Sequence, residues 1–333
     1  MKISVFGCGS WGTALAHHMA RHGHDVLAWA REPEVVEGIG TDHRNPLFLD
    51  DLELDPGLAA STDLEAVGRH ADVWIWVVPV QFSRKVMEQL RGVLRDEVVI
   101  VSASKGIETH TLKRMDQLAN EVLALPGERF CALSGPTFAR EVVLGHPSAA
   151  VLACPEIATA VRLQREFSDQ HLRCYAGQDL VGVELAGALK NVIAIAAGIV
   201  DGLGFGSNTQ AALMTRGLHE ITRLGVALGA QVDTFRGLAG MGDLVLTCTG
   251  TLSRNRQVGK RLGRGESLQE ILGSMREVAE GVRTAPAATR LASGLGVELP
   301  ISDMVARILA GKIEPREALQ GLMRRELKEE SRL

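Results

Sequence analysis

A glycine-rich string near the start of the chain does most to restrict its fold. Residues 7–12 read Gly-Cys-Gly-Ser-Trp-Gly, between the apolar run Ile3–Phe6 and a helix-like segment beginning at Thr13. In such a setting Gly7 permits a tight turn, Gly9 lets a diphosphate approach the backbone, and Gly12 lets helix and strand pack closely. The first N–H groups of the helix then face the anion. The string predicts a dinucleotide-binding site, and a glycine turn without a ligand is the alternative.

The first half of the chain alternates strand-like and helix-like segments, which is typical of a mostly parallel sheet covered by helices. The expected strands are Ile3–Phe6, Val26–Ala30, Val73–Val78, Val98–Ser102, Cys131–Ser134, Ala149–Ala153 and Leu172–Tyr175. The expected helices of the second half are residues 180–200, with Asp179 as N-cap, then 208–229 and 285–295, with turns at 203–207 and 240–242. We therefore expect an α/β Rossmann-type N-terminal domain at residues 1–178, with helices on both faces of its twisted sheet. An all-α domain should follow at 179–333.

The charge balance and the cysteine pattern exclude several classes of protein. A net charge of −4 gives no basic excess for nucleic acid or an anionic membrane surface, so the expected partner is a small molecule. The five cysteines form no C-x-x-C pair, and no histidine cluster supplies a metal site. The most apolar stretch, near residues 191–200, is shorter than the ~20 residues that span a bilayer. With no separate signal region at the N-terminus, we expect a cytoplasmic protein without metal or integral membrane segment.

The end of the second expected strand bears on the choice of cofactor. In this kind of fold an acidic residue there binds the ribose 2′-hydroxyl of NAD, whereas a nearby arginine suits a 2′-phosphate. Arg31 follows the strand directly and the first acid, Glu32, comes one position later. This order favours NADP(H), with NAD(H) as the alternative.

Polar groups in the second half interrupt apolar or glycine-rich surroundings. Lys190 lies among apolar and small residues, so its amine should be paired, lowered in pKa, or both, and could then exchange protons near neutral pH. The alternative is a lysine at a helix edge whose ammonium reaches the surface. Asp243 lies between glycines and an apolar run and could orient a charged neighbour or cap a helix. Ser253 is a candidate N-cap, and Arg254 and Asn255 in the first turn predict a phosphate site. In the first half, Lys105 and the segment 134–139 follow expected strands, where open α/β sheets bind ligands.

Taken together, these motifs resemble the bacterial NAD(P)-dependent glycerol-3-phosphate dehydrogenases. The likeness covers nearly the whole chain in the family's order, through residues 7–16, 104–106, 134–139, 184–191, 240–244, 252–256 and 278–281. It implies a cofactor site of Gly7, Gly9, Ser10, Trp11, Gly12, Arg31, Lys105, Ala139, Arg254, Val278 and Glu280. It implies a triose phosphate site of Lys105, Gly135, Thr137, Lys190, Asp243, Ser253, Arg254 and Asn255. Cys8 and Thr137 depart from the commoner Ala and Ser, and the Cys8 thiol suggests a hypothesis that cofactor binding is sensitive to oxidation.

The resemblance also implies a reaction and its catalytic groups. The expected reaction is reversible reduction of dihydroxyacetone phosphate to sn-glycerol 3-phosphate, which feeds phospholipid synthesis, in an enzyme that is often a homodimer. Lys190 would transfer the proton, aided by Lys105 and Asp243, and Thr247 matches a threonine near the substrate in related eukaryotic enzymes. The rival hypotheses are a β-hydroxyacid or ketopantoate reductase of the same architecture and a non-catalytic NADP(H)-sensing module.

Overall fold

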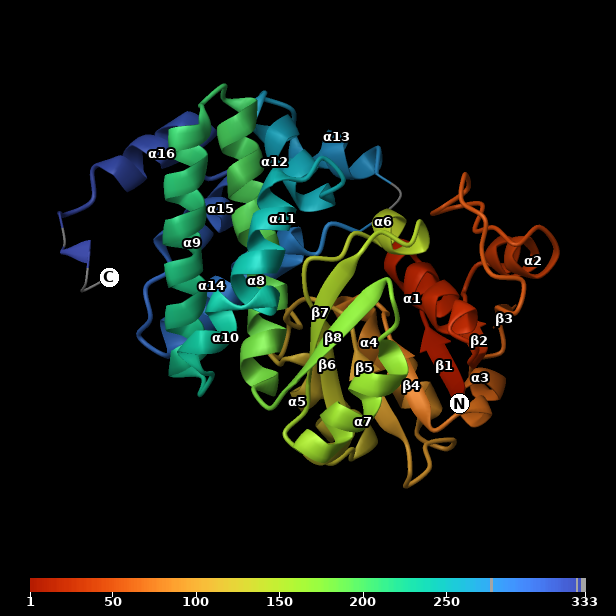
Figure 1. The fold of residues 1–333 in the computed structure, drawn as a ribbon. Coiled ribbons are helices and arrows are strands. Elements are labelled where there is room, and N and C mark those ends of the chain that lie inside the picture. The colour runs from red at the N-terminus through yellow and green to blue at the C-terminus, as the bar shows by residue number, and fades with distance from the viewer. Residues whose placement is uncertain (276–277, 328, 331–333) are drawn as a thin grey trace. The chain divides into compact units, whose positions relative to one another are not determined.

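The computed structural model describes residues 1–275, 278–327 and 329–330, which form two compact units (Figure 1). The first unit comprises Met1–Lys105 and Lys113–Val183, and the second comprises Gly106–Leu112 and Glu184–Leu333. The strands are β1 (Lys2–Phe6), β2 (Asp25–Trp29), β3 (Ala59–Ser61), β4 (Val73–Trp76), β5 (Val99–Ser102), β6 (Phe130–Ser134), β7 (Ser148–Ala153) and β8 (Leu172–Gly177). The helices among them are α1 (Ser10–Arg21), α2 (Pro33–Thr41), α3 (Leu64–His70), α4 (Val80–Leu90), α5 (Met115–Leu123), η1 (Gly127–Arg129), α6 (Ala139–Val143) and α7 (Ile157–Phe167).

The later part of the chain is helical. Its elements are α8 (Leu180–Gly202), α9 (Ser207–Ala227), α10 (Val232–Arg236), η2 (Leu238–Gly242), α11 (Asp243–Thr249), α12 (Arg254–Gly263), α13 (Leu268–Gly273), α14 (Gly281–Gly294), α15 (Pro300–Leu309) and α16 (Pro315–Met323). The fold prediction, a mostly parallel sheet followed by a helical region, is confirmed. Asp179 caps α8 as expected, because its carboxylate accepts a hydrogen bond from the N–H of Gly182 at 2.9 Å.

The sheet has the order β3-β2-β1-β4-β5-β6-β7-β8, and only β6 and β7 run antiparallel to each other. Alternate residues of β1 contact helices on opposite faces of the sheet. Ile3 and Val5 join the apolar cluster that includes α1. The Ser4 hydroxyl, on the other face, donates a hydrogen bond to the Val67 carbonyl oxygen of α3 at 2.6 Å. The four residues of β4 are buried, as the apolar run predicted. The sequence analysis missed β3, since its three residues sit at the sheet's edge and carry no apolar run.

Two expectations about the second half are wrong. The glycines at 240 and 242 do not lie in a loop. They belong to η2, a short π-helix that runs directly into α11. A Cβ on Gly240 would lie 2.1 Å from the Phe235 carbonyl oxygen, so this glycine serves close packing. The apolar stretch is also longer than expected, because α8 has the length and composition of a membrane span. Nevertheless 94% of its apolar window is buried within the described protein, as in a core helix.

Glycines bring α8 and α12 into direct backbone contact. A Cβ added to Gly198 of α8 would lie 2.0 Å from the Arg256 carbonyl oxygen, and one added to Gly259 of α12 would lie 1.9 Å from that of Ile195. Gly202 and Gly263, four residues further along each helix, meet the facing backbone in the same way. Such small residues at four-residue spacing let helix axes approach closely. The contact fixes α12 along its length against the C-terminal end of α8.

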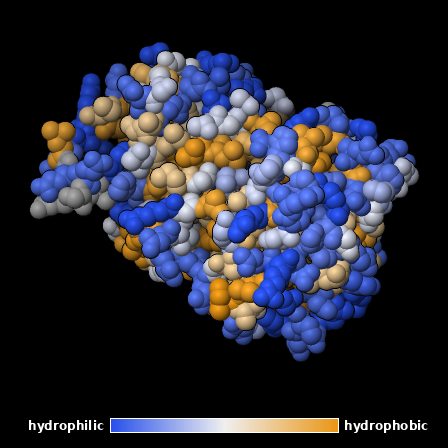
Figure 2. Space-filling view, in the orientation of Figure 1, coloured by the Kyte–Doolittle hydropathy of each residue, from blue (hydrophilic) through white to orange (hydrophobic). Residues whose placement is uncertain are grey.

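Charged and apolar side chains are mixed on the surface. The face in Figure 2 is mainly hydrophilic, with apolar residues in small groups. Some large apolar side chains are exposed, among them Phe82, Leu144 and Tyr175. Single exposed apolar side chains are common on protein surfaces.

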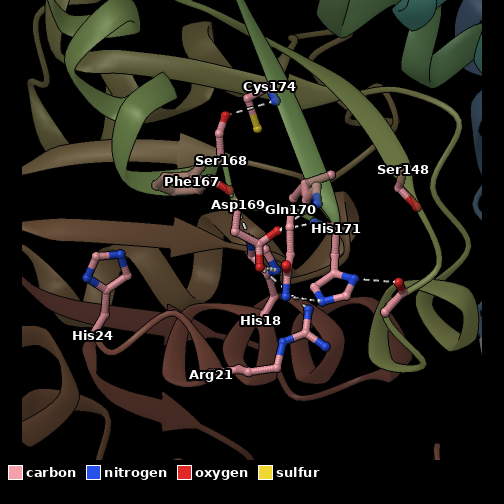
Figure 3. Close-up of polar contacts among 12 residues, drawn as sticks. His18, Arg21, His24, Ser148, Phe167, Ser168, Asp169, Gln170, His171 and Cys174 are labelled. Atoms are coloured by element: carbon pink, nitrogen blue, oxygen red, sulfur yellow. Dashed lines mark hydrogen bonds and ion pairs between the residues drawn. The ribbon is translucent and has the colours of Figure 1, made fainter.

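A polar cluster joins the end of α1 to the segment between α7 and β8 in the first unit (Figure 3). The ring Nε2 of buried His18 lies 2.9 Å from the Phe167 carbonyl oxygen, and burial lowers the pKa of this histidine. Its Nδ1 and the guanidinium of Arg21 both face the Asp169 carboxylate, at 3.8 and 3.7 Å. The second carboxylate oxygen of Asp169 accepts the N–H groups of His171 and Leu172, each at 2.7 Å. The cluster therefore holds a neutral histidine inside the protein.

Buried histidines should make the folded state sensitive to acid. Burial, followed by the charge of Arg21, lowers the pKa of His17 from 6.5 to about 4, and its Nδ1 accepts the Asp55 N–H at 2.8 Å. Between these pH values the unfolded chain binds more protons than the folded protein. The contribution of neutral His17 to the free energy of unfolding is therefore fully present above pH 6.5 and is lost as the pH falls toward 4. At about 1.4 kcal/mol for each pKa unit, the free energy of unfolding should fall by about 2 kcal/mol between pH 7 and pH 5.

Urea unfolding of the wild type and of His17→Gln across this range measures the effect. The variant should show a shallower pH dependence, whereas His22→Gln, at an exposed histidine one turn further along, should leave it unchanged. Identical slopes in the wild type and His17→Gln would contradict the assignment.

Candidate functional site

The glycine string forms the turn that the sequence analysis expected. Gly7 directly follows β1 and has a φ of +102°, a conformation that other residues rarely adopt. A Cβ on Gly12 would lie 1.7 Å from the Gly7 carbonyl oxygen, so helix and strand can pack this closely only with glycine there. At Gly9, by contrast, an added Cβ would meet no atom within 4 Å. Open space at the start of α1, where no side chain caps the helix, fits a pyrophosphate bound by the first N–H groups.

The turn is braced from behind by buried polar side chains. The Asn45 amide donates to the Cys8 carbonyl oxygen at 2.9 Å and to the Thr13 hydroxyl at 2.8 Å. Cys8 itself is 5% exposed, and burial raises the pKa of its thiol to about 12. A buried thiol that stays protonated reacts poorly, which argues against the hypothesis that oxidation of Cys8 controls cofactor binding. Cofactor affinity measured before and after alkylation of Cys8 tests it.

The structure gathers the other first-unit candidates at the same edge of the sheet. Lys105 follows the carboxyl end of β5, and Gly135 and Thr137 follow that of β6, which runs parallel to β5. The Thr137 hydroxyl bonds the Gly135 carbonyl oxygen at 3.2 Å, and Ala139 begins α6. A Cβ on Gly135 would lie 2.7 Å from the Ala149 carbonyl oxygen, so only glycine allows this approach to β7. The carboxyl ends of parallel strands are where such sheets bind ligands.

Arg31 lies just beyond β2, as expected. Its side chain is 79% exposed, and its guanidinium donates to the Glu32 carboxylate at 2.7 Å. Ser10 and Trp11 open α1, beside the turn. All three lie along the edge where a bound dinucleotide would run from the glycine turn.

In the second unit, Lys190 is buried and paired. The Lys190 residue is 6% exposed and Asp243 is 1% exposed, and the ammonium Nζ forms an ion pair with the Asp243 Oδ1. Nζ also donates to the Thr247 hydroxyl at 2.8 Å, and that hydroxyl donates to the Asp243 carbonyl oxygen at 2.6 Å. The expectation that this amine should be paired is confirmed, and the Asp243 carboxylate orients its charge. The hydroxyl and the carboxylate fix the direction of the ammonium.

The amide of Asn255 links three helices. It donates to the Asn191 Oδ1 at 3.0 Å and accepts the Gly281 N–H at 3.0 Å, and so ties α12 to α8 and to the start of α14. This use of both ends of the side chain was not anticipated. Its backbone N–H lies in the first turn of α12, where helix geometry leaves N–H groups without an intrahelical acceptor. That Asn255 contacts a phosphate stays a prediction.

Ser253 caps α12, because its hydroxyl accepts the Arg256 N–H at 3.3 Å, as predicted. Arg254, half-buried, is the first residue of the helix. Val278 is exposed, and Glu280 directly precedes α14.

Among the described residues no group of three or more His, Cys, Asp or Glu side chains could hold a metal ion.

The sequence analysis missed residues that position the site. Asn45 gave no signal, because its partners are 37 and 32 residues away. The glycines at 198, 202, 259 and 263 did carry a signal, the same four-residue spacing in both helices, which predicts close helix packing.

A Rossmann-type sheet with a dinucleotide turn, together with a helical unit that holds a buried lysine, defines an NAD(P)-dependent oxidoreductase. The family model "NAD-dependent glycerol-3-phosphate dehydrogenase N-terminus" matches residues 2–160, and the corresponding C-terminus model matches residues 179–320.

Known proteins resemble the chain over its whole length. It is 54% identical to the glycerol-3-phosphate dehydrogenase [NAD(P)+] of Geobacter sp. (strain M21), over 99% of this chain and 98% of the relative. It is 52% identical to the enzyme of that name from Nitratidesulfovibrio vulgaris (strain Hildenborough), over 99% and 100%. The crystal structure of glycerol-3-phosphate dehydrogenase from Coxiella burnetii matches 97% of this chain and 99% of its own, with a TM-score of 0.93 and 35% identity. The chain belongs to the NAD-dependent glycerol-3-phosphate dehydrogenase family, which confirms the resemblance stated above.

Proposed function

We propose that this enzyme interconverts dihydroxyacetone phosphate and sn-glycerol 3-phosphate, and so supplies the glycerol backbone for phospholipid synthesis. The observation that carries the proposal is the buried ammonium of Lys190, held by Asp243 and Thr247 in a helical unit whose α12 begins with a capped turn and an arginine. A reductase needs a proton donor for the new hydroxyl, and a phosphorylated substrate needs an anion site.

The residues divide into three tasks. The glycine turn, with Ser10, Trp11 and Arg31, holds the dinucleotide, which when bound supplies the hydride. Lys105, Ala139, Arg254, Val278 and Glu280 complete the cofactor contacts that family membership supports. Lys190 donates its proton to the developing alkoxide at the substrate's C2 oxygen, and its charge stabilises that oxygen before transfer. Asp243 orients the ammonium, and Lys105 adds a second positive charge.

The substrate phosphate is assigned to the start of α12. Ser253 caps the helix, and Arg254 provides a guanidinium. The backbone N–H groups of the first turn are hydrogen-bond donors of the kind that bind phosphate at the N-termini of helices. Gly135 and Thr137 belong to the substrate contacts that family membership supports.

A direct assay tests the proposal. Purified enzyme mixed with NADPH and dihydroxyacetone phosphate should consume the nicotinamide absorbance, and no consumption should follow with ketopantoate or a β-keto acid. Oxidation with ketopantoate alone would favour the related reductase, and NADPH binding without turnover would favour a sensing module.

Arg254→Ala should mainly weaken substrate binding. Loss of a charge-assisted contact to phosphate costs about 1.5–3 kcal/mol, so KM for dihydroxyacetone phosphate should rise at least about tenfold, with a smaller rise for the cofactor. Arg264→Ala, at the far end of α12, is the matched control. A fall in thermal stability alone, with KM unchanged, would remove Arg254 from the phosphate site.

We favour NADP(H) as the preferred cofactor because Arg31 precedes the first acid after β2. Arg31→Ala should raise KM for NADPH by about tenfold, the worth of one charge-assisted contact, and change KM for NADH little. Equal changes for both cofactors, measured by initial rates, would show that Arg31 does not recognise the 2′-phosphate.

We further propose a homodimer that works in the cytoplasm. The five cysteines are all free thiols, which suits a reducing compartment, and the dimer rests on the family resemblance. Light scattering that gave the mass of one chain would contradict the dimer, and fractionation that left the enzyme outside the cytoplasm would contradict the location.

A further inference from the structure

Two of the five cysteines lie at one end of an antiparallel strand pair: Cys131 is in β6, and Cys154 directly follows β7. The register of β6 and β7 pairs Ala132 with Ala153 and Leu133 with Leu152, so the next position outward pairs Cys131 with Cys154. Cross-strand partners have side chains on the same face of the sheet and Cα atoms about 4.5–5.5 Å apart. This separation lies within the range of about 4.4–6.8 Å that a disulfide spans.

The two thiols also affect each other's pKa. Hydrogen bonding from the Cys131 thiol and from the Glu156 N–H acts on the Cys154 sulfur. These donors lower the pKa of Cys154, whereas the same contact, followed by burial, raises the pKa of Cys131. While protonated, Cys154 donates to the Glu128 carbonyl oxygen at 3.3 Å. Cys154 therefore loses its proton first, and its neighbour is placed to attack it next.

The other three cysteines provide a contrast within the same protein. Burial raises the pKa of Cys8, Cys174 and Cys248 to about 12 in each case, and the structure shows no second thiol bonded to any of them among the described residues.

We propose that Cys131 and Cys154 form a reversible dithiol–disulfide pair that reduces hydrogen peroxide. The Cys154 thiolate attacks one peroxide oxygen and becomes a sulfenic acid, while the O–O bond breaks and the departing hydroxide takes a proton to leave as water. The Cys131 thiol then loses its proton, attacks the Cys154 sulfur and displaces the second water. In sum, two thiols and one peroxide give one disulfide and two waters. Both residues are buried, which favours an oxidant as small and uncharged as peroxide over bulky disulfides.

The test treats the folded, full-length enzyme with low peroxide, then quenches, denatures and alkylates it. Mass spectrometry should show that two of the five thiols are lost, that one cross-linked peptide joins residues 131 and 154, and that dithiothreitol restores all five. Five thiols remaining, or a linkage through another cysteine, would overturn the proposal.

Single variants separate the roles of the two thiols. Cys131→Ala should leave Cys154 as a sulfenic acid that dimedone traps, whereas Cys154→Ala should leave Cys131 largely unreacted. Cys174→Ala, at a buried cysteine on the adjoining β8, is the matched control and should still form the 131–154 cross-link. Equal dimedone labelling of the two single variants would show that the cysteines react independently and would contradict the pair.

Discussion

Replacing Lys190 with alanine should lower kcat by about 100-fold or more, the usual contribution of a positioned general acid. Cofactor affinity should change little, because the dinucleotide turn belongs to the first unit and Lys190 to the second. Stopped-flow turnover with NADPH and fluorescence titration of NADPH measure the two effects separately. A variant with near-normal turnover would remove Lys190 from the proton-transfer step.

A second variant separates chemistry from folding. Loss of Lys190 leaves the Asp243 carboxylate buried without its cation, and breaking a buried pair in this way costs about 3–5 kcal/mol. Adding Asp243→Asn to Lys190→Ala removes that charge and should recover most of the lost thermal stability while turnover stays low. Recovery of turnover together with stability would mean that Lys190 only holds the fold.

Gly9→Ala should abolish tight cofactor binding while leaving the protein folded. An added Cβ meets no atom within 4 Å, and the φ of −68° suits alanine, so stability should stay within about 0.5 kcal/mol of the wild type. The methyl group would fill space that the pyrophosphate needs. Such a steric clash lowers the binding free energy by about 1–3 kcal/mol, which raises the Kd for NADPH by about 10- to 100-fold. Titration calorimetry measures this Kd.

Gly40→Ala is the matched control for this change. Gly40 is also exposed, and a Cβ there also meets nothing within 4 Å, but it lies on α2, away from the turn. It should leave the Kd for NADPH unchanged. Equal effects of the two substitutions, or normal binding by Gly9→Ala, would contradict the pyrophosphate site.

Local patterns were enough to predict most of the sheet and the dinucleotide turn. Strands such as β4 are continuous apolar runs, and Gly12 packs on the carbonyl oxygen of Gly7, only five residues earlier in the sequence. The need for Lys190 to be paired followed from the cost of burying a charge. That Asp243 supplies the pairing carboxylate, 53 residues away, could only be a hypothesis until the helices were placed.

Two features that the sequence did not reveal are a local turn and a contact between distant segments. The π-helical turn before α11 arises where Gly240 packs on the backbone of Phe235. The amide of Asn255, which the sequence analysis assigned to the phosphate, also links α12 to α8 and α14. The Asn255 link has no local signature, because its partners Asn191 and Gly281 are 64 and 26 residues away.

The glycine contact between α8 and α12 has a consequence for redesign of this enzyme. Since the two backbones touch at Gly198 and Gly259, no side chain of any size can be introduced there to tilt one helix against the other. Attempts to make the enzyme accept a different phosphorylated ketone should therefore leave this crossing intact and vary the residues that project from the first turn of α12. Libraries that randomise the crossing would mostly yield chains that do not fold.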